Sequence, residues 1–258
     1  MKIGLIGEGA IGQYVRETLS GLGLEPVVTL VRAARLNEGA AAQKVASVND
    51  LPSDLDLMID CAGHSALVEH GPAVLQRGFD LVTVSVGALA DPDLLDTLKR
   101  AAQSGGARLV LASGAIGALD CLQSARVGGL DEVTYVGRKP PMGWKGSPAE
   151  GKVDLAALTT ATEHFSGTAR QAALEYPKNA NVAAAVAMAG TGFDQTKVRL
   201  LADPAVTANI HEIHAKGAFG SFSFQIQGNP LPDNPRSSAL AAMSVVASVL
   251  RERAAISV

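Results

Sequence analysis

The residues with the clearest chemical potential lie at the start of the chain, where Gly7-Glu8-Gly9-Ala10-Ile11-Gly12 follows a short apolar run. The Gly-x-Gly-x-x-Gly spacing stands directly between a predicted strand and a predicted helix. In that context Gly7 makes the tight turn, Gly9 lets the backbone approach a pyrophosphate, and Gly12 allows close helix–strand packing. A turn without a ligand is the alternative, but the context favours a dinucleotide site. Its predicted cofactor contacts are Gly7, Gly9, Ala10, Ile11 and Gly12.

The second part of such a site is the residue that follows the second strand. An acidic side chain about twenty positions after the glycines commonly binds the ribose 2′-hydroxyl. Here Val31 is followed by Arg32-Ala33-Ala34-Arg35 instead. An arginine can accommodate a 2′-phosphate, although Arg32 and Arg35 are equally consistent with ordinary surface cations. Both NAD and NADP therefore stay open as the cofactor, with Arg32 as a candidate contact.

Proton transfer near neutral pH is chemistry suited to histidine, and the chain has five histidines. His211 stands in Asn209-Ile210-His211-Glu212-Ile213-His214, and a histidine titrates close to neutral pH. If this stretch is a strand, His211 and His214 point to opposite faces, which argues against a two-histidine metal site. No metal is predicted. Taken alone, His211 is more simply a structural histidine.

Short apolar runs and helical stretches alternate through residues 1–113, which indicates a parallel sheet covered by helices on both faces. The predicted strands are Lys2–Gly7, Pro26–Val31, Leu55–Cys61, Leu81–Val86 and Arg108–Ala112. The predicted helices are Ala10–Leu22, Ser65–Arg77 and Asp91–Gln103. The predicted fold class is α/β, with a Rossmann-type doubly wound sheet forming a dinucleotide-binding domain over residues 1–113.

The pattern changes after residue 113. The elements predicted there are a loop and helix (Gly114–Val127), a strand (Glu132–Val136), an alanine-rich buried helix (Val182–Ala189), and three consecutive strands (Lys197–Ala202, Asn209–Lys216 and Phe219–Gln227) with a tight turn at Gly217. We expect residues 114–233 to form an α+β domain with a mixed or antiparallel sheet. A last helix, within residues 234–258, is expected to pack back on the first domain.

Composition narrows the class of partner. The chain has 258 residues, 47% of them hydrophobic, and a formal net charge of −3, with a sequence pI near 6.0. This balance gives no broad attraction to nucleic acid or to anionic membranes, so we expect a small-molecule substrate. The two cysteines, Cys61 and Cys121, form no CxxC pair, and the first residues lack a signal-peptide pattern. A cytoplasmic location is expected.

Several stretches, in order along nearly the whole chain, resemble the L-aspartate dehydrogenase family. They are the glycine motif, Ser113-Gly114-Ala115-Ile116-Gly117-Ala118-Leu119-Asp120, Tyr176-Pro177-Lys178-Asn179-Ala180-Asn181-Val182-Ala183, Asp203-Pro204 followed by Asn209-Ile210-His211, and Asn234-Pro235-Arg236-Ser237-Ser238. The glycine motif is common to many proteins. The loop after Ser113 and the Pro-Lys-Asn segment are specific.

The resemblance implies NAD(P)-dependent oxidation of L-aspartate to iminosuccinate, which hydrolyses to oxaloacetate and ammonia, or the reverse reductive amination. It implies that Ala115 and Asn181 contact the cofactor, that His211 is the active-site histidine, and that the protein is a homodimer or larger oligomer. Some members of the family act in NAD biosynthesis and others in catabolism. From the residues alone, Asn181 is also a candidate N-cap of the alanine-rich helix.

Alternatives remain for the substrate and for its carboxylate contacts. Lys139 and Lys178 are the nearest cations by position, but surface lysines are common and each is more simply a surface residue. A dihydrodipicolinate-reductase-like or homoserine-dehydrogenase-like oxidoreductase is a rival interpretation. An NAD(P)-binding sensor without catalysis is a rival from another class.

Overall fold

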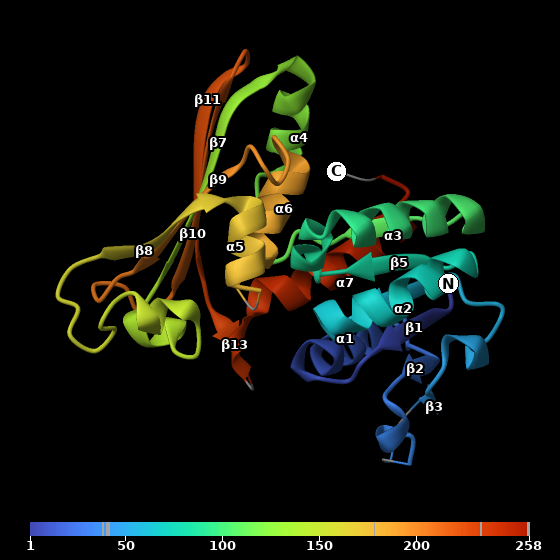
Figure 1. Ribbon diagram of the computed structural model, residues 1–258. Coiled ribbons are helices and arrows are strands. Elements are labelled where there is room, and N and C mark those ends of the chain that lie inside the picture. Colours follow the sequence, from blue (N-terminus) through green and yellow to red (C-terminus); the bar gives the residue numbers. More distant parts are fainter. Residues whose placement is uncertain (38, 40–41, 178, 233, 257–258) are drawn as a thin grey trace. The chain divides into compact units, whose positions relative to one another are not determined.

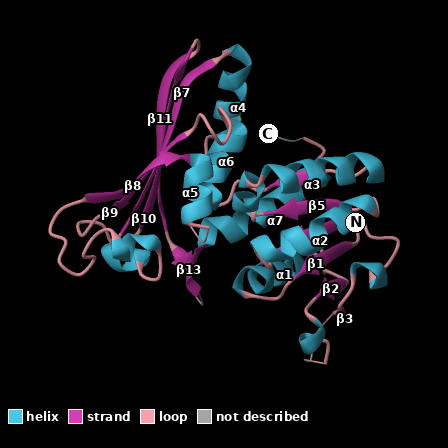
Figure 2. Cartoon of the chain, viewed as in Figure 1, coloured by secondary structure: helices cyan, strands magenta, loops and turns pink. Residues whose placement is uncertain are grey.

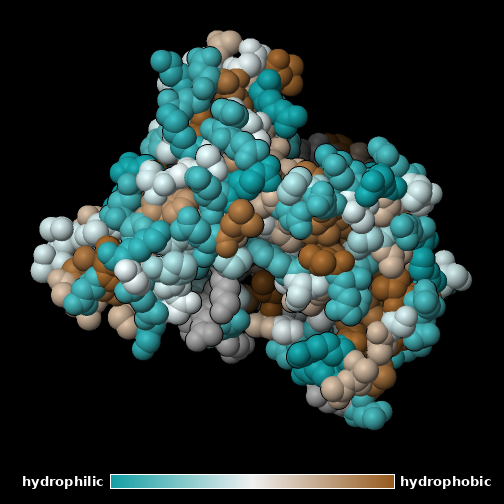
Figure 3. Space-filling model, viewed as in Figure 1, coloured by the Kyte–Doolittle hydropathy of each residue, from teal (hydrophilic) through white to brown (hydrophobic). Residues whose placement is uncertain are grey.

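The computed structural model describes residues 1–37, 39, 42–177, 179–232 and 234–256. The chain divides into two compact units, one formed by Met1–Gly114 with Leu231–Val258 and the other by Ala115–Pro230 (Figure 1). Hydrophilic side chains cover most of the face drawn in Figure 3, interrupted by scattered hydrophobic patches. Among the described residues, no helix has the length and apolar character that a membrane crossing requires.

The first unit is built on a six-stranded, all-parallel sheet with the order β3-β2-β1-β4-β5-β6. Its strands are β1 (Ile3–Ile6), β2 (Val28–Leu30), β3 (Gln43–Val45), β4 (Leu57–Asp60), β5 (Asp80–Thr83) and β6 (Leu109–Leu111). This is the order of the Rossmann fold, so the predicted fold class is confirmed for this unit. The short edge strand β3 was not predicted.

Three helices connect these strands, and a fourth comes from the end of the chain (Figure 2). They are α1 (Ala10–Gly21), α2 (His64–Gln76), α3 (Pro92–Gly105) and α7 (Ala239–Arg253), with short 3-10 turns at Ala33–Arg35, Val48–Asp50 and Val86–Ala90. The start of α3 shows why the sequence folds this way locally. The Asp91 carboxylate accepts hydrogen bonds from the backbone amides of Asp93 and Leu94, and Pro92 occupies the first helical position.

The end of the chain belongs to the core of this first unit. Val245, Val246 and Val249 of α7 join the buried cluster that contains Ile3 and Leu5 of β1. The helix begins at Ala239, later than the predicted start, because Asn234–Ser238 forms a strand, β13, which makes a two-stranded sheet with β12 (Pro230–Leu231). Within this unit, Ser244 Oγ also accepts a hydrogen bond from the Gly114 amide (3.0 Å).

The second unit has a five-stranded mixed sheet, covered on one face by helices. Its strands are β7 (Leu130–Lys139), β8 (Thr162–Thr168), β9 (Lys197–Ala202), β10 (Asn209–Gly217) and β11 (Gly220–Gly228). Its helices are α4 (Leu119–Gly128), α5 (Ala169–Glu175) and α6 (Asn181–Ala189), with 3-10 turns at Pro141–Trp144 and Pro148–Gly151. Helix α6 is almost entirely buried, as its run of alanine and valine predicts.

The order of this sheet differs from the order of its strands along the chain. The strands run β11-β10-β7-β9-β8, so β9 and β10 follow each other in sequence but are separated by β7. Strand β7 pairs parallel with β9 and antiparallel with β10, which makes the sheet mixed. The predicted hairpin of β10 and β11 is present, and Gly217 pairs with Gly220 across its turn.

Candidate functional site

The glycine loop has the conformation that its spacing predicts. Gly7 has a φ of 85°, in the left-handed region, and a Cβ there would lie 2.7 Å from the Cβ of Ala62. A Cβ on Gly12 would lie 2.7 Å from the carbonyl oxygen of Gly7, so only glycine allows α1 to pack this closely. A Cβ on Gly9 would meet no atom within 4 Å, so the backbone at the start of α1 faces open space.

A cavity of about 390 Å³ lies at the carboxyl ends of β1, β2 and β4, where Rossmann folds bind nucleotides. Of the predicted contacts, Gly7, Gly9 and Arg32 line it. Gly12 and Ala10 do not line it, and Ile11 packs against the hydrophobic core of the unit. The exposed amides at the start of α1 and the space in front of Gly9 fit a pyrophosphate group.

Charged side chains surround this cavity. The Glu8 carboxylate lies 2.9 Å from Lys44 Nζ and 3.4 Å from Arg35 Nε. Lys44 is nearly buried, with its side chain 5% exposed, whereas Arg32 is exposed at the cavity wall. Arg35 therefore forms an ion pair with Glu8, whereas Arg32 lines the cavity as an exposed residue.

A buried carboxylate ties together the strand ends near this cavity, and sequence reasoning missed it. Asp60, the last residue of β4, accepts hydrogen bonds from Thr83 Oγ1 (2.7 Å), Ser85 Oγ (2.7 Å) and the Ala62 amide (2.9 Å). Burial raises the pKa of Asp60, and the three donors partly oppose that rise. The sequence signal for this site was the aspartate that ends the otherwise apolar strand β4.

In the second unit, His211 lies on a face of the sheet that it shares with Tyr135. His211 of β10 stands opposite Gly137 of β7, and Tyr135 is two residues before Gly137 on the same face. The Tyr135 hydroxyl lies 2.8 Å from His211 Nδ1. It reaches this position across Gly137, because a Cβ on Gly137 would lie 2.8 Å from the hydroxyl oxygen.

The surroundings keep both side chains neutral. His211 is 7% exposed, and burial together with the positive charge of Lys139 lowers its pKa to about 4. Burial raises the pKa of the Tyr135 hydroxyl, so the phenol keeps its proton. The Tyr135 hydroxyl and His211 Nδ1 thus hold each other in place by one hydrogen bond, and the second ring nitrogen, Nε2, is left for other chemistry.

Lys139 continues the same face of β7, two residues after Gly137. Its ammonium donates a hydrogen bond to Asn179 Oδ1 (2.5 Å) and lies 4.7 Å from the centre of the Trp144 ring. Burial lowers the pKa of Lys139 to about 8. Lys139 is therefore no ordinary surface lysine, contrary to the simpler interpretation of the sequence.

The remaining predicted residues are spread over the second unit. Ala115 is buried ahead of α4, and Asn181 is the first residue of α6. The N-cap of α6 is Ala180, so the prediction of Asn181 as N-cap is wrong by one position. His214 is exposed and contacts Ser223 Oγ (3.0 Å) on the other face from His211. Lys178 falls outside the described residues.

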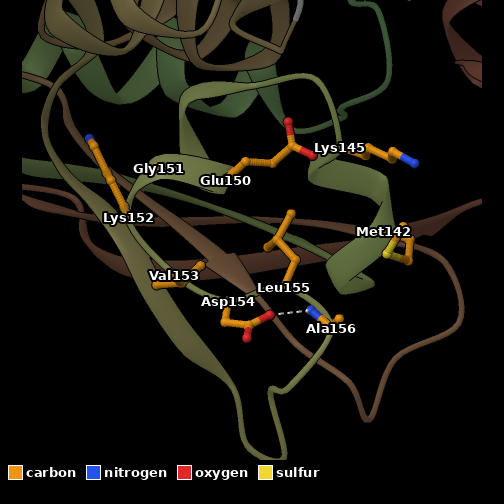
Figure 4. A pocket seen from close by; sticks show the side chains of 9 residues that line it. All are labelled: Met142, Lys145, Glu150, Gly151, Lys152, Val153, Asp154, Leu155 and Ala156. Carbon is orange, nitrogen blue, oxygen red and sulfur yellow. Dashed lines mark hydrogen bonds between the residues drawn. The ribbon is translucent and has the colours of Figure 1, made fainter.

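Two further features of the second unit contain none of the predicted residues. A cavity of about 540 Å³ opens between Met142 and Ala156, where the Asp154 carboxylate accepts a hydrogen bond from the Ala156 amide (3.1 Å; Figure 4). The His164 ring packs edge-on against the Trp144 ring, with 4.4 Å between the ring centroids. In the parts of the chain that are described, no three side chains of the metal-binding types gather into a metal site.

Two family profiles match this chain, and the gap between them, at residues 113–119, includes the first boundary between the units. The profile of the C-terminal domain of aspartate dehydrogenase matches residues 120–252. The chain belongs to the aspartate dehydrogenase family. The profile of the NAD-binding domain of homoserine dehydrogenase matches residues 3–112, which contain the glycine loop. Membership of the aspartate dehydrogenase family confirms the resemblance stated above.

Individual relatives of the family match over nearly the full length. An L-aspartate dehydrogenase of Ruegeria pomeroyi is 54% identical, covering 99% of this chain and 94% of its own. One of Ralstonia nicotianae is 46% identical over 100% of both chains. The crystal structure of aspartate dehydrogenase from Thermotoga maritima superposes with a TM-score of 0.76 at 26% identity, covering 98% of this chain and 95% of that one.

Proposed function

We propose that this protein catalyses the NAD(P)-dependent oxidation of L-aspartate to iminosuccinate, which water converts to oxaloacetate and ammonia, and the reverse reductive amination. The observation that carries the proposal is the buried, neutral His211, held by Tyr135 in a chain that also has a nucleotide cavity. Relatives named L-aspartate dehydrogenase, 54% and 46% identical, support the choice of substrate.

The residues that would hold the nucleotide begin with the glycine loop. The glycine loop and the start of α1 bind the pyrophosphate through backbone amides, and Arg32 contacts the adenosine ribose or its 2′-phosphate. When bound, the oxidised nicotinamide supplies the hydride acceptor for the substrate. The full set of proposed cofactor contacts is Gly7, Gly9, Ala10, Ile11, Gly12, Arg32, Ala115 and Asn181.

His211 is the proposed catalytic base. With Nδ1 protonated and donating to Tyr135 Oη, Nε2 carries the lone pair that takes a proton from the substrate ammonium group. The neutral amine can then become an imine as its Cα–H bond breaks. Water next adds to the imine carbon while His211 moves its proton, and ammonia leaves as the carbonyl forms. A positioned base of this kind contributes about 10²–10⁴ in rate.

The test is the absorbance of reduced nicotinamide when the pure protein is mixed with L-aspartate and either NAD or NADP. L-glutamate, L-alanine and L-homoserine serve as substrate controls. We expect turnover with L-aspartate, and we expect His211→Ala to lower kcat by about 10²–10⁴ while nucleotide binding is unchanged. His214→Ala is the matched control, because this exposed histidine lies on the opposite face of β10. Equal activity of His211→Ala and the wild type would refute the assignment.

The roles of the two units, the oligomeric state and the cellular location belong to the same proposal. The first unit serves as the dinucleotide-binding domain and the second as the substrate-binding and oligomerisation domain, with the protein acting as a homodimer. The resemblance to the family supports the dimer, which light scattering at several concentrations would test. Two free cysteines, Cys61 and Cys121, fit a reducing cytoplasm.

A further inference from the structure

The starting point is a cation on the same sheet face as His211. Side chains alternate along β7, so Tyr135, Gly137 and Lys139 share one face. His211 of β10 stands opposite Gly137, which makes Tyr135 and Lys139 its two diagonal neighbours. Diagonal neighbours in an antiparallel pair are about 7–8 Å apart, within reach of long side chains. The positive charge of Lys139 adds to the effect of burial in lowering the pKa of His211.

The contacts of Lys139 are unusual for a partly buried ammonium group. Its contacts in the structure are the neutral oxygen of Asn179 at 2.5 Å and the face of Trp144 at 4.7 Å. No carboxylate in the described parts of the chain lies within ion-pair distance of it. A partly buried cation without a counter-charge is costly, which is why its pKa is depressed to about 8.

The neighbouring residue shows the contrast. Arg138 lies on the opposite face of β7, where its guanidinium pairs with Asp203 (2.9 Å) and Glu212 (3.5 Å). Within the described residues, the cation that faces away from His211 therefore has carboxylate partners, and Lys139 has none. The described residues thus leave the ammonium of Lys139 without a negative partner, and an anionic ligand could provide one.

We propose that Lys139, held in place by Asn179, binds one of the carboxylates of a dicarboxylate substrate beside His211. The inference rests on the proposed function, because it takes the substrate to be a dicarboxylic amino acid. It gives Lys139 a direct role in selecting substrates with two carboxylates. Asn179 is a positioning residue, since it acts on the substrate only through the ammonium of Lys139.

The arrangement also couples binding to basicity. While no anion is present, burial and, in addition, the charge of Lys139 disfavour a proton on His211, so the histidine stays neutral. A carboxylate on Lys139 offsets that charge and raises the pKa of His211. His211 is then a better proton acceptor when the dicarboxylate is bound than when the site is empty.

The experiment uses succinate, a dicarboxylate without the reacting amine, as the probe with the NAD-bound protein. Isothermal calorimetry compares the wild type with Lys139→Met, Lys139→Arg and the control Lys145→Met, whose lysine is exposed immediately after the 3-10 turn Pro141–Trp144. We expect Lys139→Met to weaken succinate binding about 10- to 100-fold, the loss of a charge-assisted hydrogen bond. Lys139→Arg should recover part of this affinity, and Lys145→Met should bind like the wild type.

Two further readouts separate this role from a structural one. Methionine fills the space of lysine without a buried charge, so Lys139→Met should be at least as stable to heat as the wild type. The NMR titration of His211 should show a higher pKa in Lys139→Met than in the wild type, and succinate should raise this pKa only in the wild type. Unchanged succinate affinity in Lys139→Met, or a loss of affinity that merely follows unfolding, would overturn the proposal.

The outcomes also distinguish this inference from the proposed function. If the wild type oxidises L-aspartate and Lys139→Met keeps the same KM for it, the carboxylate site is wrong and the activity stands. If the wild type binds succinate through Lys139 but turns over no aspartate, the activity is wrong and the dicarboxylate site stands. Propionate has one carboxylate and serves as a further control. If Lys139 selects for the second carboxylate, the wild type and Lys139→Met should differ less in their affinity for propionate than in their affinity for succinate.

Discussion

Gly137 offers the sharpest test of how the sheet positions His211. A Cβ at this buried position would lie 2.8 Å from the Tyr135 hydroxyl oxygen and 3.1 Å from Leu200 Cδ2, where ordinary contacts are 3.4–4 Å. The Gly137→Ala variant must therefore displace the hydroxyl that holds His211 Nδ1 at 2.8 Å. Overpacking of this kind costs about 1–3 kcal/mol of stability. Loss of the hydrogen bond should lower kcat/KM with L-aspartate by about three- to tenfold.

A double-mutant cycle in urea identifies the cause. Tyr135→Phe removes the oxygen at 2.8 Å, and the next contacts are 3.1 and 3.3 Å, so Gly137→Ala should cost about 1 kcal/mol less in that background than in the wild type. Gly128→Ala is the control, because its added Cβ meets nothing within 4 Å at the exposed end of α4. Equal costs of Gly137→Ala in the two backgrounds would refute the clash with Tyr135. Unchanged kcat/KM in Gly137→Ala would refute the link to His211.

Three further outcomes follow from the described contacts. Arg32→Ala should raise the KM for NADP about tenfold or more and change the KM for NAD little, as steady-state kinetics with each cofactor would show; equal effects on both would remove Arg32 from the 2′-phosphate. Asp60→Ala leaves the buried hydroxyls of Thr83 and Ser85 without their acceptor and should lower the urea unfolding free energy by about 2–5 kcal/mol. His211 has a pKa of about 4 in the folded protein, below its unfolded value near 6.5, so its contribution to stability is present above pH 6.5 and is lost as the pH falls toward 4. In His211→Gln, the free energy of unfolding should therefore fall by about 3 kcal/mol less over this pH range than in the wild type. The same pH dependence in both proteins would contradict the argument from burial.

The first unit was largely predictable because its signals are local. Gly7, Gly9 and Gly12 set the backbone of a single turn, and their spacing alone fixes which one needs a positive φ and which one packs against the helix. Apolar runs likewise mark the central strands, which are buried on both faces. The edge strand β3 escaped prediction because it has three residues, of which Val45 alone is buried.

The site in the second unit was harder to predict because its contacts join distant parts of the chain. Tyr135 and His211 are 76 residues apart, and Lys139 and Asn179 are 40 apart. The predicted strand ended at Val136, because Gly137 is usually unfavourable within a strand. The structure continues the strand to Lys139, and only then does the alternation place Tyr135 and Lys139 on the face of His211.

The two neighbouring cations of β7, Arg138 and Lys139, have different surroundings within one strand. Arg138 lies between two carboxylates and is satisfied within the fold. If Lys139 were paired in the same way, its charge would be cancelled and the proposed substrate carboxylate would find no free cation there. Burial alone would then keep His211 neutral in the empty site. The alternation of the strand keeps these two environments apart although the residues are adjacent in sequence. If the proposal for Lys139 holds, its uncompensated charge lowers stability in the empty site, and binding of the substrate carboxylate relieves that cost.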